Sequence, residues 1–235
     1  MTTVLHQLPP YDFLPSLSPF CLKVQVALRL KGVAYTTKDT LFAKAVNARG
    51  KLPYLVVDGE GHEDSTNILR VLDAKAPAGP KLFPQVDCVD LLEDWADESL
   101  YWFGVYAKFE DAEGWQRLAP HFARMFPVAL RLGGPAIGRR QTLAKLRAHG
   151  LTTRAPELVK AEFQRHLDAL ELRLAGRRFL TGDTVTAADV AVASMLAQMH
   201  PRIAPWWAAR LDERTRLKAL VQDVMTAAGL ELPAA

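Results

Sequence analysis

Ser18 and Cys21 are two side chains that could carry chemistry. Pro19 lies between them, and an apolar run follows Cys21. Serine is a preferred helix N-cap and proline suits the first helical position, so this spacing predicts a helix start. One turn of helix brings Cys21 beside Ser18. Unpaired N–H groups and the helix dipole would stabilise an anion there, a thiolate in particular. The segment has the spacing of a C-x-x-C redox site with serine first; a capped helix with a buried cysteine is the simpler alternative.

The elements that must position these side chains follow from the hydrophobic pattern of the first 80 residues. Strand and helix patterns alternate in this order: strand 4–8, helix 20–31, strand 33–37, a weak helical patch up to residue 48, strand 53–57, a tight turn at 58–61, a short strand at 62–64 and a helix from 65. This βαβ unit, followed by a helix, a hairpin and a further helix, is the order of a thioredoxin-like domain.

The remainder of the chain carries helical patterns only. They are an aromatic stripe at 91–109, an amphipathic segment at 157–174, an apolar run at 190–199 behind the capping-box pattern Thr186-Ala187-Ala188-Asp189, and a last helix at 214–228. A stretch rich in proline and glycine, 75–84, separates the two parts. We therefore expect a fold of the α+β class. Its first domain, residues 1–76, would be an α/β thioredoxin-like domain; a linker at 77–84 would lead to an all-α domain at 85–235.

Composition restricts the class of protein. With 49% hydrophobic and 23% charged residues the chain is typical of a soluble globular protein, and a net charge of +3 is too small to indicate a nucleic-acid partner. Two cysteines are too few for a disulfide framework, and no basic, apolar leader opens the chain, so a cytoplasmic location is expected. The run 190–199 is too short to span a membrane. The six histidines show no metal-binding spacing, and no metal is expected.

Charge is segregated along the sequence. Residues 87–113 hold nine acidic side chains and one basic one, Lys108, whereas residues 114–156 hold no acid, seven arginines and Lys145. Two adjacent helices that pair these faces would explain the pattern. The alternative is that the basic stretch, 117–154, meets an anionic partner or a membrane surface.

Three separated motifs resemble the cytosolic glutathione transferase superfamily. They are the run 18–24, Lys51-Leu52-Pro53-Tyr54-Leu55 with Asp64-Ser65-Thr66-Asn67-Ile68, and Phe179-Leu180-Thr181-Gly182-Asp183 with Thr186-Ala187-Ala188-Asp189. Residues 17–23, with 100–102 and 139–151, further resemble the metaxin and failed-axon-connections branch. The resemblance implies a glutathione transferase fold, glutathione as co-substrate and a homodimer.

The resemblance also implies roles for particular residues. Ser18 would donate a hydrogen bond to the glutathione thiolate and lower the pKa of that thiol. Lys51 would meet the glycyl carboxylate, and a cis bond before Pro53 would present the backbone of Leu52 to the peptide. Ser65, at a helix N-terminus, would bind the γ-glutamyl carboxylate, with Asp64 near the ammonium group.

Two questions stay open at this stage. An exposed Cys21 of low pKa would form a mixed disulfide with glutathione and support disulfide reduction instead. A relative of the metaxin branch could also be a non-catalytic interaction module that keeps the fold. If the chain is a transferase, a small apolar electrophile would bind between the domains, with Tyr11, Trp102, Tyr106 and Phe109 as candidate walls.

Overall fold

The computed structural model describes residues 2–11, 14–76, 78–86 and 88–230. Its N-terminal part contains a four-stranded sheet in the order β2-β1-β3-β4. The elements are β1 (Thr3–Gln7), α1 (Pro19–Leu30), β2 (Thr36–Asp39), the 3-10 turn η1 (Ala43–Ala45), β3 (Tyr54–Val57), β4 (Glu60–Glu63) and α2 (Ser65–Lys75). Strand β1 pairs parallel with β2 and antiparallel with β3, and β3 pairs antiparallel with β4. The thioredoxin-like arrangement is thereby confirmed.

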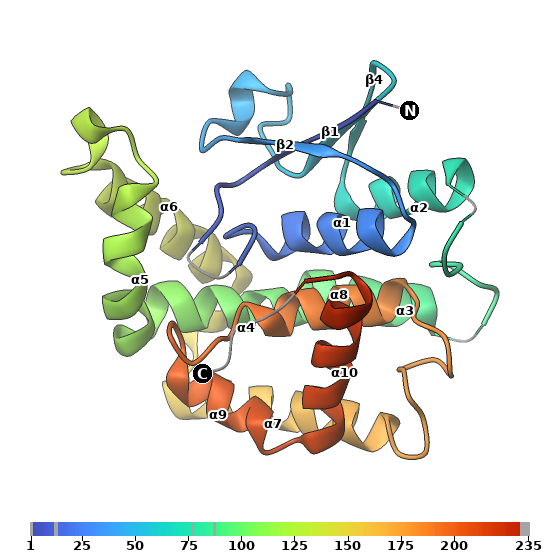
Figure 1. The fold of residues 1–235 in the computed structure, drawn as a ribbon. Helices are drawn as coiled ribbons and strands as arrows, with labels where there is room; N and C mark the ends of the chain where they lie inside the picture. Colours follow the sequence, from blue (N-terminus) through green and yellow to red (C-terminus); the bar gives the residue numbers. More distant parts are fainter. Residues whose placement is uncertain (1, 12–13, 77, 87, 231–235) are drawn as a thin grey trace.

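The sheet is covered on one side by α1 and α2, which separate it from the helical part (Figure 1). Alternate residues of β1 and β3 are buried, and Leu5 is paired with Leu55 across the two strands. Period-two burial of this kind places one apolar face of a sheet against helices. Helix α1 is buried along almost its whole length, because it lies between the sheet and α8 (Ala187–Ala197).

The helical part begins with one continuous helical rod from residue 89 to 110. Its segments are α3 (Val89–Trp95), the π turn η2 (Ala96–Leu100), α4 (Tyr101–Val105) and the π turn η3 (Tyr106–Glu110). The later elements are α5 (Ala112–Arg124), η4 (Val128–Leu130), α6 (Gly134–His149), η5 (Leu151–Thr153), α7 (Pro156–Arg173), α8, α9 (Pro205–Asp212) and α10 (Thr215–Ala227). Helices α5 and α6 extend beyond the end of α1 on one side of the molecule (Figure 1).

Helix α8 is the centre of the helical domain. All of its residues are buried, and it packs against α1, α3 and α10. The predicted capping box is present: Asp189 accepts hydrogen bonds from the backbone N–H of Thr186 at 2.8 Å and of Leu180 at 2.7 Å. The predicted linker, 77–84, lies between α2 and α3, with residue 77 outside the described residues.

None of the helices in the described part of the chain is both long and apolar enough to cross a membrane. The expected pairing of the acidic and basic stretches is largely wrong. Among described residues, the ion pair between Arg117 and Glu113, one turn apart, is the one that joins the two stretches. The other paired acids of the stretch contact bases elsewhere in the fold, for example Asp111 with Lys160. Tertiary packing therefore gives these acids partners that no local charge pattern indicates.

Candidate functional site

Two cavities adjoin at the N-terminus of α1. The smaller, of about 180 Å³, is polar; its described lining comes from the loop before β3, the start of α2 and the π turn η2. The larger, of about 720 Å³, is mostly apolar and is lined by the loop before α1, α4, η3 and the α5–α6 pair. Ser18 and Pro19 line the larger cavity and Phe20 lines the smaller one. The first turn of α1 is therefore the boundary between them.

Ser18 is the N-cap of α1, as predicted. Its backbone is extended, with φ −88° and ψ 123°, and its Oγ accepts a hydrogen bond from the backbone N–H of Cys21 at 3.3 Å. The N–H of Ser18 donates to Oγ of Ser16 at 3.2 Å, which fixes the loop before the helix. The serine hydroxyl is thus held at the edge of the large cavity, at the positive end of the helix dipole.

Cys21 is fully buried and lies outside the described lining of both cavities. Burial raises the pKa of its thiol, although hydrogen bonds from the surrounding backbone and serine side chains oppose the shift. Because the thiolate is the reactive form, a buried thiol of raised pKa is a poor nucleophile. The idea that Cys21 is a catalytic thiol is therefore corrected: the residue packs the inner face of α1.

The loop before β3 forms one wall of the small cavity. The peptide bond between Leu52 and Pro53 is cis, as predicted, and both residues line the cavity together with the exposed Lys51. Asn47 holds this loop: its Nδ2 donates to the carbonyl oxygen of Lys51 at 2.7 Å, and its Oδ1 accepts from the N–H of Gly50 at 2.9 Å. Sequence patterns gave no indication of Asn47, because its partners are backbone atoms of an irregular loop.

Asp64 and Ser65 form the opposite wall, at the start of α2. Asp64 has φ +70°, a region that residues other than glycine rarely occupy, and its Oδ1 accepts from the N–H of Asn67 at 3.1 Å. Strained backbone of this kind concentrates at binding sites. Ser65 is buried, and its Oγ lies 3.4 Å from Oδ2 of Asp97. The helix N-terminus with its serine is thus turned toward the cavity.

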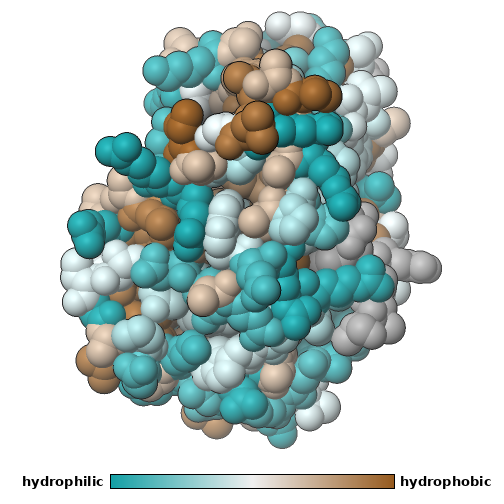
Figure 2. Space-filling view, turned by 90° about the vertical axis from the view of Figure 1, so that its left-hand side faces the viewer, coloured by the Kyte–Doolittle hydropathy of each residue, from teal (hydrophilic) through white to brown (hydrophobic). Residues whose placement is uncertain are grey.

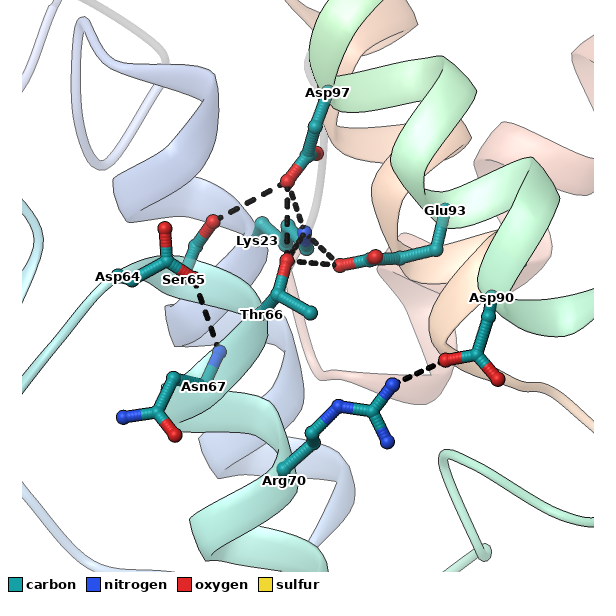
Figure 3. Close-up of polar contacts among 9 residues, drawn as sticks. All are labelled: Lys23, Asp64, Ser65, Thr66, Asn67, Arg70, Asp90, Glu93 and Asp97. Carbon is teal, nitrogen blue, oxygen red and sulfur yellow. Dashed lines mark hydrogen bonds and ion pairs between the residues drawn. The ribbon is translucent and has the colours of Figure 1, made fainter.

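A buried ionic network lies behind this wall and joins the two domains (Figure 3). Lys23 of α1 is fully buried; its Nζ forms ion pairs with Glu93 and, at 2.6 Å, with Asp97. The hydroxyl of Thr66 donates to Glu93 at 2.6 Å. Two carboxylates on successive turns of the same rod therefore enclose one ammonium group. A buried ammonium requires such partners, since an unpaired charge in the protein interior is costly.

Asp97 belongs both to this network and to the lining of the small cavity. Its Oδ2 makes the contacts just described, whereas its buried Oδ1 has no hydrogen-bond partner among the described residues. Burial, opposed by the charge of Lys23, raises the pKa of this carboxyl to about 6. Sequence reasoning missed Asp97; the available signal was a lysine in the buried face of a predicted helix, which needs an acidic partner.

The two π turns of the rod both contribute cavity-lining residues. Turn η2 carries Asp97 and Glu98 of the small cavity, and η3 carries Lys108 and Phe109 of the large one. π turns are rare and often occur at functional sites, because each changes the helical phase. The ring of Tyr101, between the turns, lies 4.7 Å from that of Phe20, so the rod also contacts the boundary of the cavities.

Three of the four aromatic residues predicted to line an electrophile pocket lie elsewhere. Tyr11 is buried against His121, with ring centroids 4.9 Å apart, and Trp102 stacks on His149 at 4.7 Å. Tyr106 is buried near Trp207. None of these three is in the described lining of the large cavity, to which the rod contributes the fourth candidate, Phe109, together with Tyr101 and Val105. The prediction therefore named the right helix but, apart from Phe109, the wrong face of it.

The mouth of the large cavity is apolar. Large side chains exposed around it include Phe42, Leu130 and Ile137, at 53%, 45% and 60% exposure. In the space-filling view of this face, hydrophobic side chains gather in the upper part, at the height of the α5–α6 connection (Figure 2). Among the described residues no group of three or more His, Cys, Asp or Glu side chains could hold a metal ion.

Family models agree with this geometry. The model described as "Glutathione S-transferase N-terminal domain" matches residues 19–114, and that of "Glutathione S-transferase, C-terminal domain" matches residues 93–223. The second match alone covers more than half of the chain. The chain belongs to the glutathione S-transferase family.

Relatives support the assignment. The isoprene-epoxide–glutathione S-transferase of Rhodococcus sp. strain AD45 is 30% identical over 217 residues, covering 88% of this chain and 90% of that protein. Failed axon connections of Drosophila melanogaster is 29% identical, covering 83% of this chain and 50% of that protein, so the chain spans half its length. The crystal structure of the glutathione transferase GSTFuA3 from Phanerochaete chrysosporium has the same fold, with a TM-score of 0.67 at 16% identity over 100% and 99% of the two chains.

Proposed function

We propose that the protein binds glutathione in the small cavity and activates its thiol at Ser18 for attack on an apolar electrophile in the large cavity. One observation carries the proposal: the small cavity offers a helix N-terminus and, beside it, a carboxylate oxygen of Asp97 that has no hydrogen-bond partner among the described residues. These two groups are complementary to an amino acid end that carries both a carboxylate and an ammonium group. The γ-glutamyl end of glutathione is such a group.

The rest of the small cavity fits the rest of the tripeptide. We assign Ser65 to the γ-glutamyl carboxylate and Oδ1 of Asp97 to the ammonium group, a role that sequence reasoning gave to Asp64. Asp64 instead uses Oδ1 to cap α2. The backbone of Leu52 is available to pair with the cysteinyl unit, and Lys51 to meet the glycyl carboxylate. The thiol then falls at the first turn of α1.

Ser18 has the position to act on that thiol. Its Oγ, at the dipole end of α1, stabilises a sulfur anion by hydrogen bonding and lowers the thiol pKa. The thiolate attacks a carbon of the electrophile held in the large cavity, and the protein contributes proximity and charge stabilisation without a covalent intermediate. The apolar lining selects a small apolar electrophile.

The test is calorimetric titration with glutathione, followed by a conjugation assay. We expect binding in the micromolar to low millimolar range, and thioether formation with a small apolar electrophile. Asp97→Asn should weaken the binding of glutathione. Arg70→Met, which removes an exposed ion pair between α2 and the rod that carries Asp97, should not. No binding at millimolar glutathione by the folded protein would contradict the transferase proposal and favour a non-catalytic module.

A further inference from the structure

Lys108 is a buried cation that the proposed function does not use. It is 4% exposed and lines the large cavity from the π turn η3. The described lining of that cavity contains Lys108 as its one charged side chain and holds no carboxylate. An ammonium group without a counter-ion is expensive to bury, so a buried lysine in the wall of a mostly apolar cavity calls for a function.

A comparison with the other buried lysines sharpens this point. Lys23 has two carboxylate partners, and Lys31 has Asp73 at 3.1 Å. Lys108, within the described residues, has one neutral partner: its Nζ donates to Oε1 of Gln198 at 3.0 Å. The first two lysines are satisfied structural ions. The third keeps donor capacity that the protein does not use.

A chain of hydrogen bonds positions Lys108 relative to the thiol site. Gln198 of the helical domain accepts from Lys108 and, through Nε2, donates to the carbonyl oxygen of Ser16 at 3.3 Å. Oγ of Ser16 in turn accepts from the N–H of Ser18. The ammonium group and the Ser18 hydroxyl are thus tied to the same loop across the domain boundary, and both residues line the same cavity.

We propose that Lys108 is the general acid for electrophiles whose ring opens to leave negative charge on oxygen, so that the large cavity is suited to small apolar epoxides. This inference rests on the proposed function. As sulfur attacks carbon, a C–S bond forms and the C–O bond breaks, with its electron pair moving to oxygen. The ammonium group of Lys108 gives a proton to that oxygen and regains one from solvent. The thiol proton leaves to solvent, so the sum of glutathione and epoxide is a hydroxy thioether.

The protonation equilibrium of Lys108 suits this role. Burial lowers the pKa of its ammonium group to about 7, close to the value at which a general acid is most effective at neutral pH. The other titratable group of the described lining, Tyr101, has its pKa raised to about 12 by burial and stays neutral. Arg139 of α6, which donates to the carbonyl oxygen of Phe109, and the acids Glu110 and Asp111 at the end of η3 are the charged neighbours; none pairs with Lys108 among described residues.

The experiment compares two probes of similar size, styrene oxide and benzyl chloride, with glutathione. The oxide needs a proton on its leaving oxygen, whereas chloride leaves without one. Lys108→Met should lower kcat/KM for the oxide by about 10²-fold, the usual worth of a general acid, and for the chloride by less than about threefold. The pKa of the bound glutathione thiol, followed by thiolate absorbance, should stay unchanged.

A pH profile gives a second readout. In the parent protein kcat/KM for styrene oxide should fall as pH rises through about 7, where Lys108 loses its proton, and the chloride profile should show no such fall. Lys108→Arg keeps the charge but cannot give up a proton, so its kcat/KM for the oxide should be as low as that of Lys108→Met and should show no fall near pH 7.

Three results with these variants would overturn the proposal. They are equal losses with both probes, a raised thiol pKa in Lys108→Met, or a loss specific to the oxide in Tyr101→Phe and not in Lys108→Met. Turnover of the chloride but not of the oxide by the parent protein would also overturn it, leaving the transferase function intact. Failure of the transferase proposal looks different: the parent would neither bind glutathione nor consume either probe.

Discussion

The two cavities differ in how their walls are made. The small cavity is lined by polar groups that already have partners, such as Asn47 on the Lys51 carbonyl and Asp97 on Lys23. The large cavity is lined by apolar side chains of distant segments, with a single charged group in its described lining, Lys108. Fixed polar groups recognise one ligand through geometry, whereas an apolar wall accepts a range of shapes. This difference supports the proposal that the small cavity recognises glutathione and the large one selects the electrophile.

The strongest way to break the small cavity is to remove the ion at its base. Lys23→Met leaves Glu93 and Asp97 buried without a counter-charge and should destabilise the protein by about 3–5 kcal/mol. Arg70→Met, which removes an exposed ion pair between α2 and the same rod, should cost less than about 1 kcal/mol. Urea unfolding of both variants measures the difference. Equal stabilities would mean that the network does not hold the cavity wall.

Removal of the Ser18 hydroxyl, at the boundary between the two cavities, should slow the reaction without weakening the binding of glutathione. Ser18→Ala should lower kcat by about 10²–10³-fold, the effect of losing one anion-stabilising donor, with little change in the affinity for glutathione. The pKa of the bound thiol should rise. Loss of the N-cap also costs about 1 kcal/mol of stability, so thermal unfolding is measured in parallel. Cys21→Ala is the matched variant: activity lost there and kept in Ser18→Ala would assign the chemistry to the cysteine.

Substitution of Asp97 should change the KM for glutathione and not that for the electrophile. Asp97→Asn should raise the KM for glutathione by about tenfold, the worth of one charged hydrogen bond, and leave the KM for the electrophile unchanged. The carboxylate must be ionised to hold an ammonium group, and its pKa is raised to about 6. Affinity of the parent for glutathione should therefore fall as pH drops below about 6, and the variant should lose this dependence. Calorimetry at pH 5 and pH 7.5 checks both statements, and an unchanged pH dependence would remove Asp97 from the site.

Lys51 should matter less, because it is exposed at the rim of the small cavity. Lys51→Met should raise the KM for glutathione by no more than about fivefold, in line with the worth of an exposed ion pair, and added salt should reduce the difference. Kinetics at about 20 mM and about 500 mM salt test this expectation. A salt-independent effect would indicate a role other than charge.

The smallest effect is expected at the mouth of the large cavity. Ile137 is 60% exposed, so Ile137→Ala should change the KM for an apolar electrophile by only about two- to threefold. The KM for glutathione should not change. An effect on glutathione alone would show that the two cavities do not divide the substrates as proposed.

Local patterns predicted one cavity much better than the other. The cap at Ser18 and the helix start at Ser65 were predicted, because each depends on a few adjacent residues. The cis bond before Pro53 is also present, but it was implied by the resemblance to the glutathione transferases and not by local residues. Asp97 was not predicted, since its role depends on Lys23, which lies 74 positions away. Loop closure over such a span leaves no periodic signal in the sequence.

The large cavity escaped prediction for a related reason. A uniform helical period over the aromatic stripe at 91–109 places Trp102, Tyr106 and Phe109 on the cavity face. Two π turns interrupt that period, so that Tyr101 and Val105 line the cavity with Phe109, and Trp102 and Tyr106 do not. Close packing decides the opposite wall: a Cβ at Gly134 would lie 2.5 Å from the ring of Phe126, so only glycine allows that approach.

The sequence by itself determined the order of elements, the two-part fold, and the serines at two helix starts. These properties are local, because caps, turns and hydrophobic periods act over a few residues. The tertiary structure decided that Cys21 is buried, that Asp97 lines the small cavity and that Lys108 lines the large one with no carboxylate partner among the described residues. The burial of a side chain and the charges beside it are set by segments far apart in the chain. These two factors shift the pKa of the side chain and thereby decide whether it is reactive.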